Sequence, residues 1–360
     1  MLSSDAKFGY IPALDGLRAF SVLIVIAAHY GLEYIIPGGF GVTIFFFISG
    51  FLITRLLIAE SEYNNKLHLL NFYLRRLARL YPALLFMVLG SSALFWLFDL
   101  GSPTSFEFFA AIFYYMNILL VFQSEGIGDT YMSWNPLWSL AVEEHFYLIF
   151  PALIILFNLH WKRILGALLL LLPLVLAWRF WIVFATDFQA EIYTNTMTDA
   201  RIDSIVWGCT LTLLLHGYGT VVNNKWLVGW IPIIGAILLL LSTFLIRDPV
   251  FRDTVRYSIQ GGALFILFLN LYYNRSLIFV VHFLEWRPLV WLGRLSYPLY
   301  LWHFVMLDFW QRMLENTPLV VLLAILSSLL LAIISFRVVE RPAMALRKQF
   351  GAHIVLDGRK

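Results

Sequence analysis

The sequence predicts an all-α protein, a polytopic bundle of transmembrane helices. Of its 360 residues, 61% are hydrophobic and only 13% are charged, so the chain cannot assemble the polar exterior of a soluble globule. Continuous apolar runs recur from Leu14 to Phe336, each long enough to cross a hydrocarbon core of roughly 30 Å as a helix. The two-residue alternation that is typical of a transmembrane β-barrel is absent.

About ten segments have the length and hydropathy of a membrane span. The first contains Arg18 and lacks the small-residue site of a cleavable signal, so it is expected to stay in the protein. The predicted spans are residues 14–34, 39–58, 78–98, 138–158, 164–185, 201–217, 226–246, 257–273, 290–310 and 318–337.

The stretch FEFFAAIFYYMNILLVF (106–122) is predicted to form an extra helix that is re-entrant or lies on the membrane surface. The basic clusters on either side of it, at 75–79 and 162–163, should both be cytoplasmic under the positive-inside rule. An even number of crossings must then separate them, and spans 78–98 and 138–158 provide it. If 106–122 crosses the membrane fully, one of the neighbouring predicted spans must be assigned wrongly. Ten spans leave both termini in the cytoplasm.

The chain is predicted to be one integral-membrane domain over residues 1–340, followed by a short basic cytoplasmic tail over 341–360. Its net charge of +3 does not indicate nucleic-acid binding, because the basic residues lie mainly in short loops between spans. No metal site is predicted. The single cysteine, Cys209, cannot form a multi-cysteine site, and the span histidines come from different helices without the spacing of a zinc motif.

The first span carries two side chains that are costly inside a membrane, Arg18 and His29. Eleven positions separate them, which in an α-helix is three turns plus about 20°, so both project from one face, roughly 16 Å apart along the axis. A charge at the bilayer centre costs on the order of 3 kcal/mol, so such residues are functional candidates. The alternatives are an arginine that snorkels to lipid headgroups and a histidine that hydrogen-bonds a neighbouring helix.

Two further stretches carry charges at or inside predicted spans. In FYLRRLARLYPALL, Arg76 and Arg79 lie one turn apart at the start of a helix, where guanidinium groups can bind a phosphate or serve only as positive-inside flanks. In WNPLWSLAVEEHFYLIFP, Glu143 and Glu144 are adjacent inside a span. Two neighbouring carboxylates cannot both face lipid, so one of them should point into a polar cavity.

Two more motifs place polar residues near helix ends. In DARIDSIVWG, Arg201 and Asp203 lie at the mouth of a span, and in GRLSYPLYLWHF the spacings of four and three put Ser296, Tyr300 and His303 on one helix face. Hydrogen bonding within the bundle is the alternative interpretation for both motifs.

Taken together, these motifs resemble the membrane-bound acyltransferase-3 family, whose members O-acylate saccharides and related acceptors. The resemblance covers nearly the whole chain. It rests on the Arg18-to-His29 spacing, GGFGVTIFFFISGFLITRLL, the Arg76-to-Arg79 spacing, WSLAVEEHFYLIFP, DARIDSIVWG, SYPLYLWHF and VERP. Family members commonly have Asp where this chain has Thr43, and often Gln where it has His145.

The resemblance implies that acyl-coenzyme A, most simply acetyl-CoA, enters from the cytoplasm as co-substrate and that no metal takes part. Arg18, Arg76 and Arg79 would then meet its phosphates, while the pantetheine arm runs inward along the first helix. His29 would act as general base toward the acceptor hydroxyl, because an imidazole can stay neutral near pH 7 in a desolvated site. A variant in which His29 itself carries the acyl group is the alternative.

Glu143 is predicted to orient His29 or the acceptor hydroxyl, and Tyr300 or an arginine is predicted to stabilise the oxyanion. Other polar residues of the motifs are site candidates without an assigned role: Ser49, Arg201, Asp203, Ser296 and His303.

The expected acceptor is a saccharide such as O-antigen, exopolysaccharide or a lipid-linked glycan, acylated at or across a bacterial cytoplasmic (inner) membrane. Some family members carry a fused extracytoplasmic hydrolase-like domain, which is not predicted here. This chain is therefore expected either to complete the transfer alone or to pass the acyl group to a separate extracytoplasmic partner. Membrane lipid is the other expected partner. The alternative function is a secondary transporter that uses intramembrane Arg, His and Glu as a proton or anion path, although no paired Gly- or Pro-interrupted spans support it.

Overall fold

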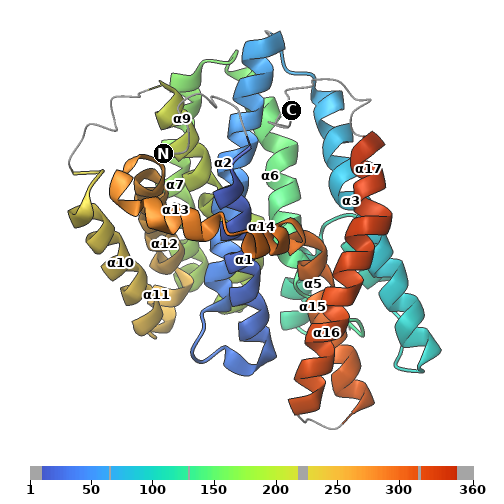
Figure 1. The fold of residues 1–360 in the computed structure, drawn as a ribbon. Helices are drawn as coiled ribbons and strands as arrows, with labels where there is room; N and C mark the ends of the chain where they lie inside the picture. Colours follow the sequence, from blue (N-terminus) through green and yellow to red (C-terminus); the bar gives the residue numbers. More distant parts are fainter. Residues whose placement is uncertain (1–9, 65, 129, 218–225, 315–317, 347–360) are drawn as a thin grey trace.

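Long helices run up and down through the molecule, as Figure 1 shows for the computed structural model. The structure describes residues 10–64, 66–128, 130–217, 226–314 and 318–346, and within these ranges the chain forms helices and no strand. The all-α prediction is therefore confirmed. Most of the predicted basic tail, 347–360, lies outside the described residues.

The helices follow one another along the chain with short connections. The first half contains α1 (Pro12–Ala27), the π-helix η1 (Ala28–Leu32), α2 (Gly38–Asn64), α3 (Leu69–Leu97), α4 (Ser105–Ile112), α5 (Met116–Ser124), α6 (Leu137–Leu156) and α7 (Trp161–Ala185). The second half contains α8 (Ala190–Thr196), α9 (Thr198–Gly217), α10 (Trp230–Leu245), α11 (Pro249–Asp253), α12 (Val255–Tyr273), η3 (Arg275–Leu277), α13 (Ile278–Leu284), α14 (Arg287–Arg294), α15 (Ser296–Met313), α16 (Pro318–Ile334), η4 (Ser335–Glu340) and α17 (Arg341–Leu346).

Six helices of the described chain are long and apolar enough to cross a membrane, and the pair α12 and α13, bent by 90°, makes a seventh candidate. The protein is therefore a multi-pass membrane protein. All ten predicted segments are helical over most of their length. The counts differ because α10 has only 16 residues, α9 carries charged groups in its first turns, and segment 290–310 is divided between α14 and α15.

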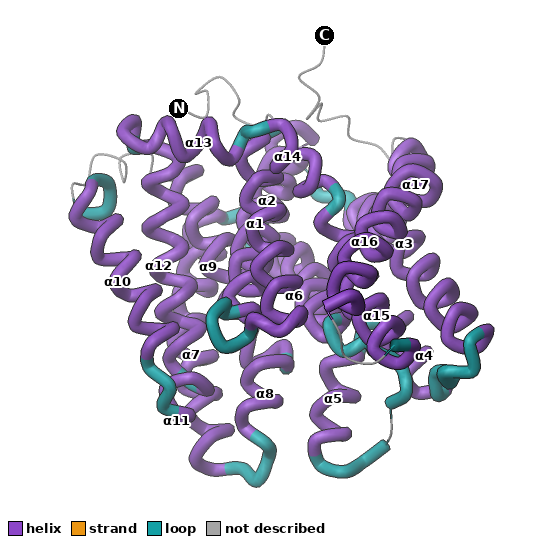
Figure 2. The backbone as a smooth tube through the Cα atoms, turned by 60° about the horizontal axis from the view of Figure 1, so that its bottom comes forward, coloured by secondary structure: helices purple, strands orange, loops and turns teal. Residues whose placement is uncertain are grey.

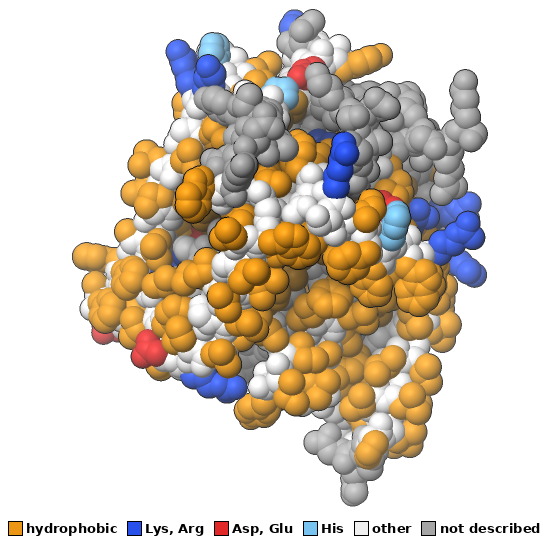
Figure 3. All heavy atoms as spheres, turned by 60° about the vertical axis from the view of Figure 1, so that its left-hand side comes forward, with side chains coloured by type: hydrophobic (Ala, Val, Ile, Leu, Met, Phe, Trp, Pro, Cys, Tyr) orange, Lys and Arg blue, Asp and Glu red, His pale blue; other side chains and the backbone are white. Residues whose placement is uncertain are grey.

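The surface agrees with this assignment. Hydrophobic side chains cover most of the face that Figure 3 shows, and Lys, Arg, Asp, Glu and His gather mainly at its margins. A continuous apolar band of this kind cannot face water without promoting association, and it matches the hydrocarbon core of a bilayer.

The first predicted span, 14–34, does not stay α-helical to its end. After Ala27 the chain widens into η1, where Tyr30 and Gly31 leave helical geometry and Gly31 adopts φ +100°. Glycine tolerates that φ because it has no Cβ. Tyr30 and Gly31 both follow His29, so the chain leaves helical geometry only after the imidazole.

The segment 106–122 is two short helices and not one. α4 and α5 are separated by a break at Tyr114, which has φ +57°. Thr104 and Glu107 form a capping box that fixes the start of α4, and the buried Glu107 carboxylate also accepts hydrogen bonds from the backbone N–H groups of Tyr131 and Met132. Neither helix is long enough to cross a membrane, as the prediction of a non-crossing segment requires.

At the centre of the bundle, α2 packs against α1 and α9. Its contact with α9 is backbone to backbone. A Cβ added at Gly50 would lie 2.0 Å from the carbonyl oxygen of Ile205, and one added at Gly208 would lie 2.0 Å from that of Phe47. Small residues allow this close approach of two helices in a membrane. The contact fixes α9 against α2, and both helices carry polar site candidates.

The two ends of the bundle hold different parts of the candidate site. In Figure 1, α3 starts and α17 lies at the upper end, whereas the turn that joins α1 to α2 lies at the lower end. Figure 2, in which the bottom of Figure 1 comes forward, shows α5, α8 and α11 at this same lower end. The arginines in the first turns of α3 and the π-turn that carries His29 therefore belong to opposite ends of the bundle.

Candidate active site

Arg18 lies in α1 beside the carboxylate of Asp15, with 3.8 Å between Nη1 and Oδ1. Asp15 also accepts a hydrogen bond of 2.5 Å from the hydroxyl of Tyr10 and lies 3.7 Å from Nε of Arg294. Partial burial and the hydrogen bond to Asp15 raise the pKa of Tyr10. The Arg18 guanidinium is 23% exposed, and its distance from Asp15 exceeds that of a hydrogen bond. Its N–H groups can therefore still bind another anion.

A second polar cluster joins α3 to α6. Nη2 of Arg76 lies 3.6 Å from Oε1 of Glu144, and its guanidinium carbon lies 3.3 Å from the centroid of the Tyr147 ring. Ser49 of α2 hydrogen-bonds the hydroxyl of Tyr147 and the carboxylate of Glu143. Among the described residues, Nε of Arg76 and Oε1 of Glu144 are buried without a hydrogen-bond partner. This ion pair is therefore loose and leaves the Nε–H of Arg76 for a ligand.

Glu143 interacts electrostatically with residues of both parts of the predicted site. It lies within electrostatic range of Arg18 on one side and of Tyr300 on the other. The buried hydroxyl of Tyr300 donates to the carbonyl oxygen of Pro136 at 2.9 Å and lies 2.8 Å from Oγ of Ser139. The start of α6 and the middle of α15 are held together by these bonds.

The series ends in two imidazoles. The ring of Tyr300 lies 5.4 Å from that of His303 on the same helix, and Nε2 of His303 lies 2.8 Å from Nδ1 of His29. His303 is fully buried, whereas His29 is exposed. Polar side chains thus follow one another from Arg18 and Arg76 through Glu143 and Tyr300 to His303 and His29.

Arg201 and Asp203 are both fully buried, but they have different partners. Asp203 binds Arg179 of α7 at 2.8 Å, whereas Nη2 of Arg201 donates to Oγ1 of Thr43 at 3.1 Å. The Arg201 guanidinium also lies 3.7 Å from the centroid of the Tyr257 ring. In the described part of the chain, Nε and Nη1 of Arg201 find no partner. These charged residues hold α7, α9 and α2 together. Their contacts within the described residues do not include either imidazole.

The remaining predicted residues lie near the connected series. Arg79 is half-buried and interacts electrostatically with Glu340, whose side chain is 6% exposed. Ser296 is buried at the start of α15. Both places are at the junction of α3, η4 and α15, where the terminal VERP motif meets the predicted phosphate end.

Some residues of these clusters are not among the predicted site residues. Arg179 is a charged residue inside the apolar run 164–185, and that signal alone could have marked it. Ser139 and Tyr30 have no such signal, because a serine or tyrosine in a span is common. Their partners become visible only once α6, α15 and the π-turn are in place.

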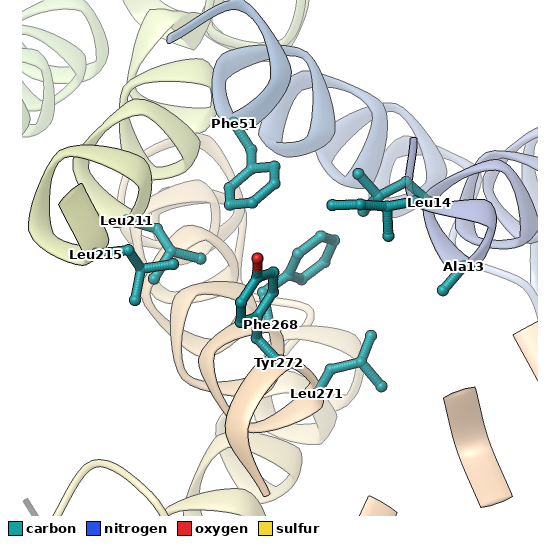
Figure 4. A pocket seen from close by; sticks show the side chains of 9 residues that line it. Ala13, Leu14, Phe51, Leu211, Leu215, Phe268, Leu271 and Tyr272 are labelled. Carbon is teal, nitrogen blue, oxygen red and sulfur yellow. The ribbon is translucent and has the colours of Figure 1, made fainter. Parts of the chain in front are cut away.

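Figure 4 shows a pocket that lies apart from these polar groups. Its lining is apolar except for the hydroxyl of Tyr272, and it encloses about 10 Å³, room for one water molecule. It lies between α1, α2, α9 and α12 and has no group that could do acyl-transfer chemistry.

Comparison with known proteins also indicates an acyltransferase. The Acyltransferase domain family matches residues 11–337. The O-acetyltransferase OatA of Staphylococcus aureus (strain NCTC 8325 / PS 47) is 34% identical over 367 residues, covering 98% of this chain and 60% of that protein. The peptidoglycan O-acetyltransferase OatA of Listeria monocytogenes serovar 1/2a is 32% identical over 352 residues, covering 92% and 56%.

A putative O-acetyltransferase of Staphylococcus aureus (strain COL) is 31% identical over 362 residues, covering 93% of this chain and 58% of that protein. The chain thus spans about three fifths of the length of these curated relatives. No solved structure matches it significantly. Because the family match extends from the start of α1 into η4, and so includes every polar side chain of the connected series, the chain belongs to the membrane-bound acyltransferase-3 family.

Proposed function

We propose that this chain is an O-acyltransferase that moves an acetyl group from acetyl-CoA, on the cytoplasmic side of a bacterial membrane, to a hydroxyl group of a saccharide. The connected series of polar side chains from Arg18 and Arg76 to His29 is the observation that supports this proposal most. Peptidoglycan is the first acceptor to test, because the Listeria relative is named for it. O-antigen, exopolysaccharide and lipid-linked glycans are the other acceptors to test.

Acetyl-CoA would bind at the upper end of the bundle in Figure 1, where α3 begins. Arg76 would bind a phosphate through the N–H at Nε, which its loose pair with Glu144 leaves without a partner, and Arg18 and Arg79 would add charge from α1 and the next turn of α3. Arginine suits this role because its planar guanidinium can donate two hydrogen bonds to one phosphate.

The chemical step would take place at His29. Its imidazole removes the proton of the acceptor hydroxyl as the oxygen attacks the thioester carbonyl carbon, a C–O bond forms and the C–S bond breaks. The same proton then passes to the sulfur, so that free coenzyme A leaves as a thiol. An acetyl-histidine intermediate is the alternative, and ping-pong kinetics would identify it.

Glu143 and Tyr300 would act between these ends. Glu143 has no contact with His29 among those the described residues form, and it lies beside Arg76 and Ser49, which supports a role near the donor. The hydroxyl hydrogen of Tyr300 already binds the carbonyl of Pro136, so an oxyanion would have to displace that bond. An arginine is therefore the better-supported oxyanion donor.

A labelling experiment tests the proposal. Membranes that contain the protein are supplied with radiolabelled acetyl-CoA and purified peptidoglycan precursors, and label in the saccharide fraction is measured. We expect label with the wild type and, at equal protein level, a labelling rate at least about 100-fold lower with His29→Ala, because general-base catalysis contributes about 10²–10⁴-fold. His282→Ala, an exposed histidine of α13, is the matched control and should label normally. Labelling of His29→Ala at a rate near that of the wild type would remove the proposed base, and no label with any saccharide would refute the activity.

A further inference from the structure

His29 and His303 form a pair between distant parts of the chain. One ring comes from the π-turn after α1 and the other from α15. The ring planes differ by 7° and the ring centroids lie 5.1 Å apart. With 2.8 Å between Nδ1 of His29 and Nε2 of His303, the N–H of one ring and the lone pair of the other lie close to a common plane. This is the geometry of a hydrogen bond between two imidazoles.

The position of each proton follows from a third group. Nδ1 of His303 lies 2.6 Å from the carbonyl oxygen of Tyr300, which can only accept. Nδ1 of His303 must therefore carry hydrogen. A neutral imidazole has one N–H, so Nε2 of His303 is an acceptor, and Nδ1 of His29 must donate to it. The only unprotonated nitrogen left in the pair is Nε2 of His29.

That nitrogen is available. Among the described residues, Nδ1 of His29 is hydrogen-bonded and Nε2 is not, and the side chain is exposed. The ring is also held in place, because Phe304 packs its edge against it with 4.9 Å between ring centroids. An imidazole with one fixed N–H and one accessible lone pair is the form that a general base needs.

The backbone supports the same contact. The hydroxyl of Tyr30, the residue after His29, donates to the carbonyl oxygen of His303 at 2.9 Å and lies 3.2 Å from Oγ of Ser328. Two consecutive residues of the π-turn thus attach to His303. A π-turn often marks a functional site, and here its residues His29 and Tyr30 both contact His303 of α15.

We propose that His303 is a positioning residue for His29: it accepts the Nδ1–H hydrogen bond, and so holds His29 in the tautomer whose Nε2 can take the acceptor's proton. The proposal rests on the proposed role of His29 as the base. When the hydroxyl proton reaches Nε2, the Nδ1–H of the resulting imidazolium still donates to His303, and this charge-assisted bond is stronger than the neutral one. The proton leaves again from Nε2 to the sulfur, so His303 gains and loses none.

Two substitutions separate an acceptor role from a packing role. His303→Met fills similar space without a strong acceptor, whereas His303→Gln can place a carbonyl oxygen near the position of Nε2. We expect His303→Met to lower kcat by about 10- to 100-fold with KM for acetyl-CoA unchanged, a smaller loss than the roughly 10²–10⁴-fold expected when the base itself is removed. His303→Gln should recover a large part of this loss. Equal losses in both variants, or a changed KM alone, would overturn the proposal.

A double variant provides the decisive readout. If His303 acts only through His29, His29→Ala together with His303→Met should be no less active than His29→Ala alone, because the second change removes an interaction already lost. Multiplying losses would mean that His303 works independently of His29. Melting temperatures identify variants that fail to fold, and His282→Met controls for the loss of a histidine.

The activities of the single variants distinguish the proposed base, His29, from the proposed positioning residue, His303. Full activity in His29→Ala refutes the base assignment itself. An inactive His29→Ala combined with a wild-type kcat in His303→Met refutes only the role of His303.

Discussion

The contact between α2 and α9 makes a quantitative prediction at Gly208. A Cβ at this position would lie 2.0 Å from the carbonyl oxygen of Phe47 and 2.8 Å from the backbone nitrogen of Phe51, whereas ordinary contact begins at 3.4 Å. Both neighbouring atoms are backbone, so no side chain can rotate away. In Gly208→Ala the two helices must therefore separate by about 1.4 Å at this point.

The cost of this separation can be estimated. Overpacking a well-packed interior costs about 1–3 kcal/mol, and at a backbone contact we expect the upper part of that range. For 360 residues the unfolding entropy is about 0.76 kcal/mol/K, so each kcal/mol lowers the melting temperature by about 1.3 °C and Gly208→Ala should lower it by about 3–4 °C. Thr212 also donates to the carbonyl of Phe51 across the same contact, and that bond should weaken as the helices move apart.

The assay is thermal unfolding of the purified protein in detergent, followed by tryptophan fluorescence. Gly166→Ala is the matched control, because Gly166 lies inside helix α7, is exposed, and has no atom within 4 Å of an added Cβ. It should be neutral or slightly stabilising, since alanine favours a helix by about 1 kcal/mol over glycine. A melting temperature of Gly208→Ala equal to or above that of the wild type would refute the reasoning.

Three further predictions concern charged residues. Glu107→Ala removes the acceptor of the backbone N–H groups that the carboxylate binds, and should cost about 2–5 kcal/mol of unfolding free energy. Denaturant titrations measure this cost, and an unchanged denaturant midpoint would contradict the prediction. Arg179→Met leaves Asp203 charged and buried, and should cost about 3–5 kcal/mol of unfolding free energy. Adding Asp203→Leu to Arg179→Met should restore part of this loss, and an equally unstable double variant would argue against this. Arg76→Ala and Arg79→Ala should each raise the apparent KM for acetyl-CoA about 10-fold and that for the acceptor much less in steady-state assays, and equal effects on both would indicate a structural role instead.

The helical bundle could be predicted from the sequence because continuous apolar runs of span length leave few other structures in a membrane. The break at Tyr114 could not, since no glycine or proline marks it and a left-handed tyrosine has no local signature. The π-turn after Ala27 contains Gly31, but it escaped prediction because hydrophobic periodicity assumes a regular helix to its end.

The candidate residues could be predicted individually, but their partners could not. Arg201 and Asp203 are two positions apart, yet Asp203 binds Arg179 from another helix. Glu143 is predicted to orient His29 or the acceptor hydroxyl, and the sequence did not indicate that His29 forms a hydrogen bond with His303. A costly polar group in a span signals that it has a partner, and the identity of that partner depends on how distant helices pack.

The two imidazoles that meet at the end of α1 stand 274 positions apart in the chain. A ribosome that extends the protein from its amino end delivers the first ring to the bilayer long before the helix with the second ring exists. The pair can therefore close only late in synthesis, and nascent or truncated chains that stop before α15 carry His29 without its companion.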